Sequence, residues 1–193
     1  MPCRVRGNVD KGILILCVPA FFEINIYLCF GLIERMIRLD LIYKKGTIED
    51  IDLLTKTRIE VLRAANKLSS DIDMYEVERA SYEYYRQAFL NDSHTAYLVF
   101  DGNKFVGAGG VSYYQVMPTY HNPSGKKAYI MNIYTSPSYR RNGIATKTLT
   151  LLVEDAKRRG INAISLEATE IGKPLYDKFG FVQMKNEMEY IEI

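Results

Sequence analysis

The strongest candidate for chemistry is a short apolar run followed by a basic, glycine-containing segment. Residues 130–134 (IMNIY) predict a strand, and residues 140–146 (RRNGIAT) predict the start of a helix. A helix N-terminus has unpaired backbone N–H groups and a partial positive charge, so it can hold a phosphate group. Arg140 and Arg141 add full charges there, and Gly143 permits close backbone approach or a positive φ angle. The pattern therefore predicts a site for a pyrophosphate.

The same residue types also fit a solvated turn before an ordinary helix. Other parts of the sequence are needed to distinguish this turn from a phosphate site. Neither of two common nucleotide-binding motifs, G-x-x-x-x-G-K-[ST] and G-x-G-x-x-G, occurs in the sequence. A phosphate site at residues 140–146 therefore belongs to a class of protein without these two motifs.

Further along the chain, residues 166–170 (LEATE) end an expected strand, and residues 173–181 (KPLYDKFGF) predict a short helix that ends at Gly180.

Together, these two segments resemble the GNAT acetyltransferase superfamily. The upstream segment is similar to its R-x-x-G-x-G/A acetyl-CoA motif, and the downstream segment is similar to its terminal Y-x-K-x-G-F signature. The resemblance covers about residues 36–193. It implies an α/β (α+β) fold with a mixed, mostly antiparallel central sheet that is splayed between strands 4 and 5 and flanked by about four helices.

The resemblance also implies where acetyl-CoA, the expected co-substrate, would bind. Backbone groups of the fourth strand would pair with the pantetheine arm, and amides at the following helix start would hold the pyrophosphate. The cofactor-binding residues expected on this basis are Ile133, Tyr134, Thr135, Arg140, Arg141, Asn142, Gly143, Ile144, Ala145 and Thr146.

The implied reaction moves acetyl from acetyl-CoA to a primary amine by direct attack in a ternary complex. An alkyl amine has a pKa of about 10, so a group must accept its proton before attack. Glu167, at the end of the fifth strand, is the first candidate for this base, and an ion pair is its alternative role. Asn132 is expected to orient a water or the acceptor, and a water relay stays open.

The remaining catalytic tasks are oxyanion stabilisation and protonation of the departing thiolate. A backbone N–H near Ile133 or Tyr134 would serve the first task. Tyr176 matches the family's motif tyrosine and is the expected proton donor, with aromatic packing as its alternative role.

Hydrophobic periodicity predicts the elements that position these residues. Strands are expected at 39–43, 94–100, 105–114, 127–135, 163–168 and 181–193, and helices at 74–90, 143–159 and 173–179. Another helix is expected to open at Thr47, which forms a capping-box-like pair with Asp50. The residues expected to pack in the core from the first two helices are Ile48, Ile51, Leu54, Ile59, Leu62, Tyr75, Tyr82, Tyr84 and Tyr85.

The first 35 residues differ in composition from the rest and contain all three cysteines. Residues 12–33 are strongly apolar, but Pro19, Glu23 and Asn25 interrupt them and argue against a membrane span. A signal peptide also fits poorly, because no small-x-small cleavage site follows. We expect residues 1–35 to be an atypical apolar extension or to precede a true start at Met36, and residues 36–193 to form the domain. A membrane anchor formed by residues 12–33 stays open as the less favoured alternative.

Composition excludes several other classes of protein. Three cysteines without framework spacing indicate a reducing, cytoplasmic setting. His94 and His121 are far apart and have no nearby cysteine, so no metal is expected. A G-x-S-x-G hydrolase motif does not occur. The net charge of +2 gives no electrostatic case for nucleic acid.

The acceptor amine stays open at this point. Loops 67–73 and 115–126 are expected to set acceptor specificity, and the length of the second favours a small molecule over a protein amine. Polyamines, aminoglycosides, amino acids and protein amines all fit. A non-catalytic acyl-CoA-binding module is the competing class, and a homodimer is left open.

Overall fold

The computed structural model describes residues 39–185, 187, 188 and 190. The predicted N-terminal extension, its boundary near residue 36 and the three cysteines lie outside these residues. The chain divides into two units, Met1–Leu39 and Asp40–Ile193, and every element named below belongs to the second. No helix in the described part of the chain is long and apolar enough to cross a bilayer.

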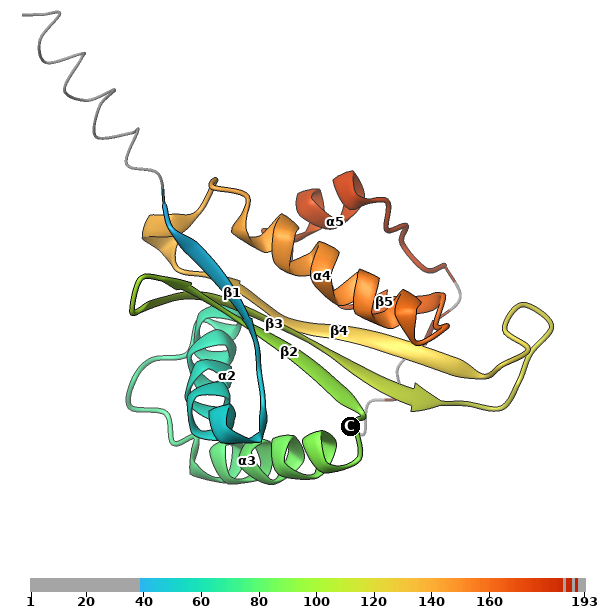
Figure 1. The fold of residues 1–193 in the computed structure, drawn as a ribbon, viewed down its shortest axis with the longest axis horizontal. Coiled ribbons are helices and arrows are strands. Elements are labelled where there is room, and N and C mark those ends of the chain that lie inside the picture. Colours follow the sequence, from blue (N-terminus) through green and yellow to red (C-terminus); the bar gives the residue numbers. More distant parts are fainter. Residues whose placement is uncertain (1–38, 186, 189, 191–193) are drawn as a thin grey trace, which may run out of the picture. The chain divides into compact units, whose positions relative to one another are not determined.

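Among the described residues, one five-stranded sheet runs through the domain, with its strands in sequence order (Figure 1). The first four strands pair antiparallel with their neighbours, and the fifth pairs parallel with the fourth. The predicted mixed, mostly antiparallel sheet is therefore confirmed. The strands are β1 (Leu41–Lys45), β2 (His94–Asp101), β3 (Lys104–Gln115), β4 (Lys126–Thr135) and β5 (Ala163–Leu166).

Four α-helices flank the sheet in the described residues, as expected. Two lie on one face and two on the other (Figure 1). On the first face are α2 (Ile51–Asn66), which the 3₁₀ turn η1 (Ile48–Asp50) precedes, and α3 (Tyr75–Leu90). On the second face are α4 (Ile144–Arg158), which η2 (Pro137–Tyr139) precedes, and α5 (Lys173–Phe179).

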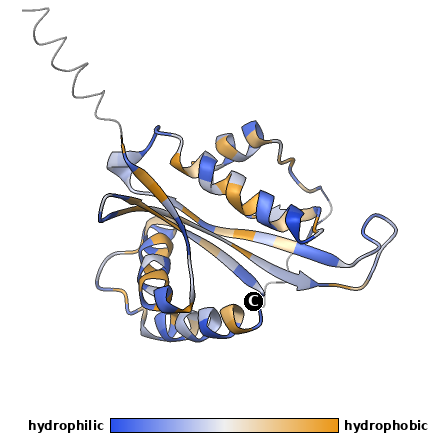
Figure 2. Cartoon of the chain, viewed as in Figure 1, coloured by the Kyte–Doolittle hydropathy of each residue, from blue (hydrophilic) through white to orange (hydrophobic). Residues whose placement is uncertain are grey.

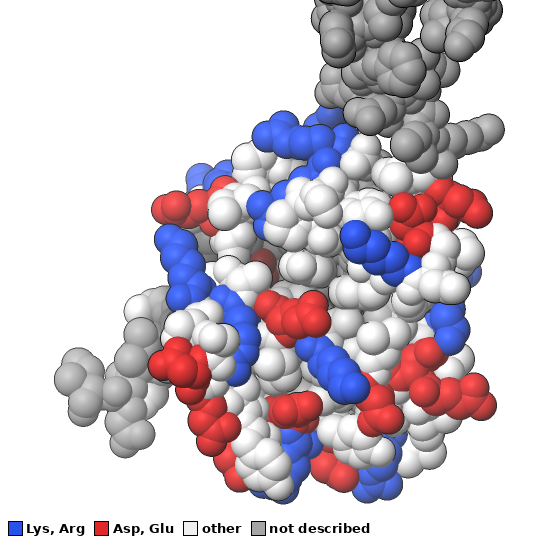
Figure 3. Space-filling view, turned by 90° about the vertical axis from the view of Figure 1, so that its left-hand side faces the viewer, with Lys and Arg blue, Asp and Glu red and all other residues white. Residues whose placement is uncertain are grey.

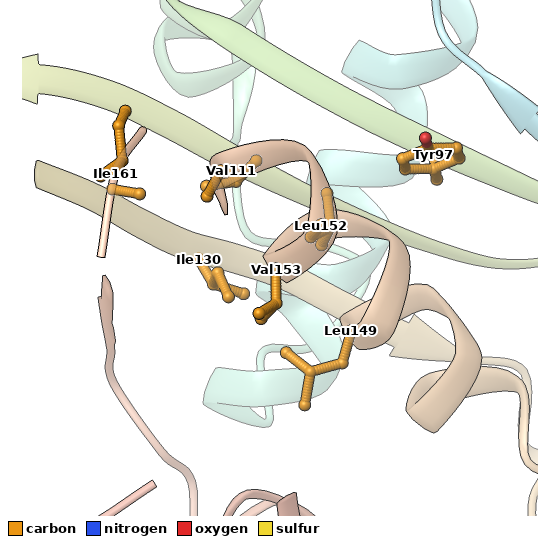
Figure 4. Packing of buried hydrophobic residues seen from close by; sticks show 9 residues of the cluster. Tyr97, Val111, Ile130, Leu149, Leu152, Val153 and Ile161 are labelled. Carbon is orange, nitrogen blue, oxygen red and sulfur yellow. The ribbon is translucent and has the colours of Figure 1, made fainter. Parts of the chain in front are cut away.

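The main core lies between α4 and the sheet, where alternate strand residues meet one stripe of the helix (Figure 4). Leu149 and Leu152 of α4 are fully buried against Val111 and Ile130. Apolar residues concentrate on the buried sides of the helices, as Figure 2 shows. A β-carbon at Gly109 would lie 2.6 Å from the Thr148 side chain, so this glycine allows α4 to approach β3 closely. The packing therefore fixes the middle of α4 over β3 and β4.

A second core joins the opposite face of the sheet to α2 and α3. It contains Ile51, Leu54 and Tyr85 from the helices, and Leu98 from β2. The expected capping pair forms at the start of this layer, because the Asp50 carboxylate accepts from both the backbone N–H and the hydroxyl of Thr47 at 3.0 Å.

Several core assignments made from periodicity are wrong. Tyr75, Tyr82 and Tyr84 are 64%, 40% and 41% exposed, because α3 buries only a narrow stripe at Tyr85 and Ala88. Ile48 is 48% exposed because it lies in the 3₁₀ turn and not on the buried stripe of α2. Ile59 and Leu62 are only partly buried.

Two strand assignments also need correction. The fifth strand ends at Leu166, two residues before the expected end. The final strand expected over 181–193 is not found in described residues 181–185, 187, 188 and 190, and its other positions lie outside the described residues. Alternation of apolar residues there indicated a strand, but these residues pair with no described strand.

A buried carboxylate ties α4 to three strands. Asp155 is 4% exposed, and burial alone would raise its pKa. Hydrogen bonds from cationic and phenolic donors outweigh burial and hold the pKa well below its usual range. The donors, with distances, are Tyr113 Oη (2.6 Å), Arg158 Nη2 (2.7 Å), Thr95 Oγ1 (2.9 Å), Lys45 Nζ (3.0 Å) and Arg159 Nε (3.0 Å).

We expect Asp155→Asn to lower the free energy of unfolding at pH 7 by about 3 kcal/mol, because it leaves buried donors without their anion. A carboxyl with a depressed native pKa stabilises the fold above its unfolded pKa of about 3.9 and loses this effect as the pH falls below it. The difference between variant and wild type should therefore shrink below about pH 4 in urea titrations. Glu154→Gln, an exposed neighbour on α4, is the control and should change stability by less than about 0.5 kcal/mol. An equal effect of both variants at pH 7 would contradict the role of Asp155.

Candidate functional site

The sheet opens between β4 and β5. The two strands pair only from Lys127 with Ala163 to Ile130 with Leu166. Because β5 ends there and β4 continues to Thr135, residues 131–135 have no strand partner on the β5 side within the described chain. The expected splay between strands 4 and 5 is therefore present, and it exposes one edge of β4 to a ligand that could pair with it.

A bulge in β4 lies at this opening. Ala108 of β3 pairs with Tyr134 and Gly110 pairs with Met131, so Asn132 and Ile133 together stand opposite Gly109. Asn132 has φ of 60°, a conformation that asparagine adopts more readily than most residues. A bulge leaves its extra residue outside the ladder and re-aims nearby groups. The bulge therefore turns part of the β4 backbone away from β3, next to the splay.

The N-terminus of α4 follows β4 and presents free amides. Lys147 N–H donates to the Gly143 carbonyl at 2.9 Å, and it is the first amide of the helix to be bonded in this way. The amides of residues 141–146 donate to no backbone carbonyl in the described part of the chain. Arg141 and Gly143 have φ of 68° and 76°, and Asn142 Nδ2 donates to the Tyr139 carbonyl at 3.0 Å. This tight turn leaves a row of donors that suits an anion.

The space around this turn is open. A β-carbon at Gly143 would meet no atom within 4 Å, and Arg140 and Arg141 are exposed. Ile144 is the exception among the expected cofactor residues here, because its side chain is buried in the core with Val99 and Val106. Only its backbone N–H can therefore face a ligand.

Tyr176 lies on α5, on the same side of the sheet as α4. Its ring packs edge-on to Phe181 with centroids 6.1 Å apart, and burial raises its pKa above the usual value of about 10. The phenol therefore stays protonated at neutral pH, as a proton donor must. Tyr176 lines a pocket of about 690 Å³ together with Leu166 and Ala168 at the end of β5. Within the described residues this pocket is lined by β5, by α5 and the segment after it, and by Val153 of α4, and no β4 residue lines it.

Glu167 and Asn132 lie on the face of the sheet opposite to α4. Tyr129 alternates with the buried Ala128 and Ile130, so it points away from α4, and the carboxylate of Glu167 is close to it. Burial, and then hydrogen bonding to Glu167, raises the pKa of Tyr129 to about 12. No hydrogen bond joins Glu167, Asn132 and Tyr176 in the described residues. The candidate base and the candidate acid therefore lie on different faces of the sheet.

The other three β4 residues have distinct surroundings. The Ile133 side chain packs towards α4, and the Tyr134 ring stacks on Phe105 with centroids 6.3 Å apart. Thr135 Oγ1 is buried and has no partner in the described part of the chain. Their backbone groups, and not their side chains, are available along the opening.

Sequence reasoning missed a polar cluster under the helices. Arg58 of α2 donates from Nη1 to Asn132 Oδ1 at 3.4 Å. Tyr84 Oη and Ser112 Oγ each lie 3.1 Å from Nδ1 of the buried His94. The polar residues of α2 gave no signal for this cluster, since periodicity does not show which strand a helix side chain meets. In the described residues, no three His, Cys, Asp or Glu side chains are grouped as metal ligands would be.

A mixed sheet that splays next to a helix start with free amides is the architecture implied by the resemblance to acetyltransferases. The profile of the Acetyltransferase (GNAT) family matches residues 62–181. The chain belongs to this family.

Solved structures and curated relatives agree with this assignment. A predicted acetyltransferase of Clostridium acetobutylicum, crystallised with acetyl-CoA, is 32% identical, with a TM-score of 0.72 over 78% of this chain and 96% of the other. A GCN5-related N-acetyltransferase of Ralstonia eutropha shares the fold, with 22% identity and a TM-score of 0.68 over 78% of this chain and 98% of the other. The ribosomal protein bS18-alanine N-acetyltransferase of Haemophilus ducreyi is 25% identical over 61% of this chain and 79% of its own length.

Proposed function

We propose that this protein transfers acetyl from acetyl-CoA to the primary amine of a small molecule, by direct attack in a ternary complex. One observation carries the proposal: the free amides of residues 141–146 start α4 directly beside the open edge of β4. A relative that is 32% identical was crystallised with acetyl-CoA, which supports the same co-substrate here. We also propose that the acetyltransferase domain spans residues 36–193 and acts in the cytoplasm.

Each part of acetyl-CoA would meet a different part of the site. The amides from Arg141 to Thr146 would bind the pyrophosphate, with the charges of Arg140 and Arg141 alongside. The backbone of residues 133–135 would pair with the pantetheine amides as a further strand would. This arrangement would bring the thioester to the bulge at Asn132, with Tyr176 on the α4 side of the sheet as the proposed proton donor.

The residues would then divide the reaction among them. Glu167 would accept, directly or through a water, the proton that the ammonium form of the acceptor must lose. The amine nitrogen would form its bond to the thioester carbon, while a backbone N–H near Ile133 or Tyr134 would donate to the oxyanion. Tyr176 would give its proton to the sulfur as the C–S bond breaks. The proton that Glu167 accepted would then pass through solvent and reprotonate Tyr176. Asn132 would orient the acceptor or the water.

The experiment that tests this proposal follows thiol release from acetyl-CoA by the full chain over a panel of amines. The panel contains amino acids, polyamines, aminoglycosides and peptides with free N-terminal alanine. We expect release with at least one small amine and the acetylated amine as product by mass spectrometry. Binding of acetyl-CoA without thiol release for any amine would favour the non-catalytic module, and no binding at all would refute the proposal.

Acetylation of a protein amine is the second candidate function. The 25% identity to the alanine N-acetyltransferase of Haemophilus ducreyi is the observation that favours it. Thiol release with N-terminal alanine peptides, and not with any small amine, would select this candidate over the first.

A further inference from the structure

A partly buried arginine lies beside the β4 bulge and has no acidic partner in the described part of the chain. Arg58 makes one hydrogen bond there, from Nη1 to Asn132 Oδ1 at 3.4 Å, although a guanidinium has five N–H donors. None of the salt bridges formed by the described residues includes it. Other arginines do find carboxylates: Arg159, for example, pairs with both Asp92 and Asp155.

The titratable side chains whose pKa values the charge of Arg58 shifts are all uncharged at pH 7. His94 is 3% exposed, and burial, followed by the charge of Arg58, lowers its pKa to about 4, so it is uncharged at pH 7. Partial burial raises the pKa of Tyr84, and burial raises the pKa of Tyr85 to about 12, so both phenols stay protonated. The hydrogen bond with Ser112 at Tyr84, and the charge of Arg58 at both residues, oppose these increases only partly. Ser112 completes the cluster through His94. The cluster therefore offers hydrogen bonds but no negative charge.

A guanidinium that is partly removed from water is unfavourable unless an anion pairs with it. Its planar fork matches a carboxylate or a phosphate through two parallel hydrogen bonds. We propose that Arg58 binds an anionic group of the acceptor, which is therefore a small primary amine that also carries a carboxylate or a phosphate. This inference rests on the proposed function, because it assigns the acceptor of the same site.

The position of Arg58 links the anion to the reacting amine. Its partner Asn132 is the bulge residue of β4, and the proposed thioester lies against residues 133 and 134 directly after it. An amine held in place through Arg58 would therefore reach the thioester from the α2 face, which is also the face of Glu167. Acidic and basic side chains are mixed on the molecular face shown in Figure 3. That face therefore carries no broad basic patch that would attract anions.

The first test compares matched amines with the full chain at saturating acetyl-CoA. L-Amino acids are compared with their primary amides, and O-phosphoethanolamine with ethanolamine, so that each pair differs in one anionic group. A hydrogen-bonded charge pair predicts a kcat/KM about 30-fold higher for the anionic member of a pair. The two kinds of pair distinguish a carboxylate from a phosphate. Equal kcat/KM values within every pair would overturn the inference.

The second test removes the charge. Arg58→Met should raise the KM for the anionic acceptor about 30-fold, with kcat and the Kd for acetyl-CoA unchanged within about twofold. Arg58→Lys should restore part of the loss, because it keeps the charge without the fork. Lys56→Met removes the same charge from an exposed position of α2 and should leave KM unchanged.

Thermal unfolding separates substrate binding from a structural role. A residue that lacks an anionic partner in the free protein should not stabilise it, so Arg58→Met should have a Tm equal to or above that of the wild type. A Tm lowered together with a proportional loss of activity for anionic and neutral amines alike would overturn the inference.

A binding measurement without turnover separates this inference from the proposed function. Calorimetry with N-acetyl amino acids and N-acetyl-phosphoethanolamine, in the presence of CoA, requires no reaction. We expect at least one of these anions to bind wild type more tightly than Arg58→Met. Equal affinity for both proteins, or no binding to the wild type, would overturn the inference whatever the turnover. Arg58-dependent binding by a protein that releases no thiol with any amine would refute the proposed function alone.

Discussion

Gly143→Asp is expected to weaken acetyl-CoA binding at least about 100-fold, the equivalent of about 3 kcal/mol. Two effects combine. The new carboxylate would stand among the free amides that start α4, where it would both compete for them and repel the pyrophosphate. Gly143 also has φ of 76°, which costs a residue with a β-carbon about 1 kcal/mol. Calorimetric titration of the full chain with acetyl-CoA measures the change.

The chain offers a close control for this substitution at the other end of the same helix. Gly160 has φ of 72°, and a β-carbon there would also meet no atom within 4 Å. Gly160→Asp therefore repeats the backbone strain and the added charge, but places them at the C-terminus of α4. It should bind acetyl-CoA as wild type does. Gly143→Asn keeps the shape of aspartate without its charge and should lose less affinity. Unchanged binding by Gly143→Asp would place the pyrophosphate elsewhere.

Local patterns in the sequence predict much of this fold because they depend on residues that are close in the chain. The alternation in residues 127–135 predicts β4, and the glycine at 143 predicts where α4 begins. Gly180, with φ of 106°, ends α5 where expected. Each of these features needs only a few neighbouring residues, so a single sequence is sufficient to find them.

Features that depend on pairing between distant segments could not be predicted in this way. The bulge at Asn132 exists because β4 has one residue more than β3 opposite Gly109, and neither strand shows this alone. Arg58 meets Asn132 across 74 positions of the chain, so no local pattern on α2 shows this contact. Tyr82 and Tyr84 were expected in the core because aromatic residues usually pack there, but α3 covers too little of the sheet to bury them.

The geometry around Tyr176 makes its hydroxyl separable from its ring. The ring packs against Phe181 and close to Gly172, where a β-carbon would lie 3.1 Å from it. Phenylalanine keeps this packing and removes only the proton donor. Tyr176→Phe therefore tests protonation of the leaving thiolate without disturbing the pocket.

We expect Tyr176→Phe to lower kcat about 100-fold, the lower end of the range for loss of a general acid, while the Kd for acetyl-CoA stays within about twofold. Steady-state thiol release gives kcat, and calorimetry gives Kd. Tyr43→Phe is the matched control, because burial also raises the pKa of Tyr43 but β1 lies away from the splay. Its kcat should equal that of wild type. If Tyr176→Phe keeps full kcat, the thiolate takes its proton from water, and the role of Tyr176 is to pack against Phe181.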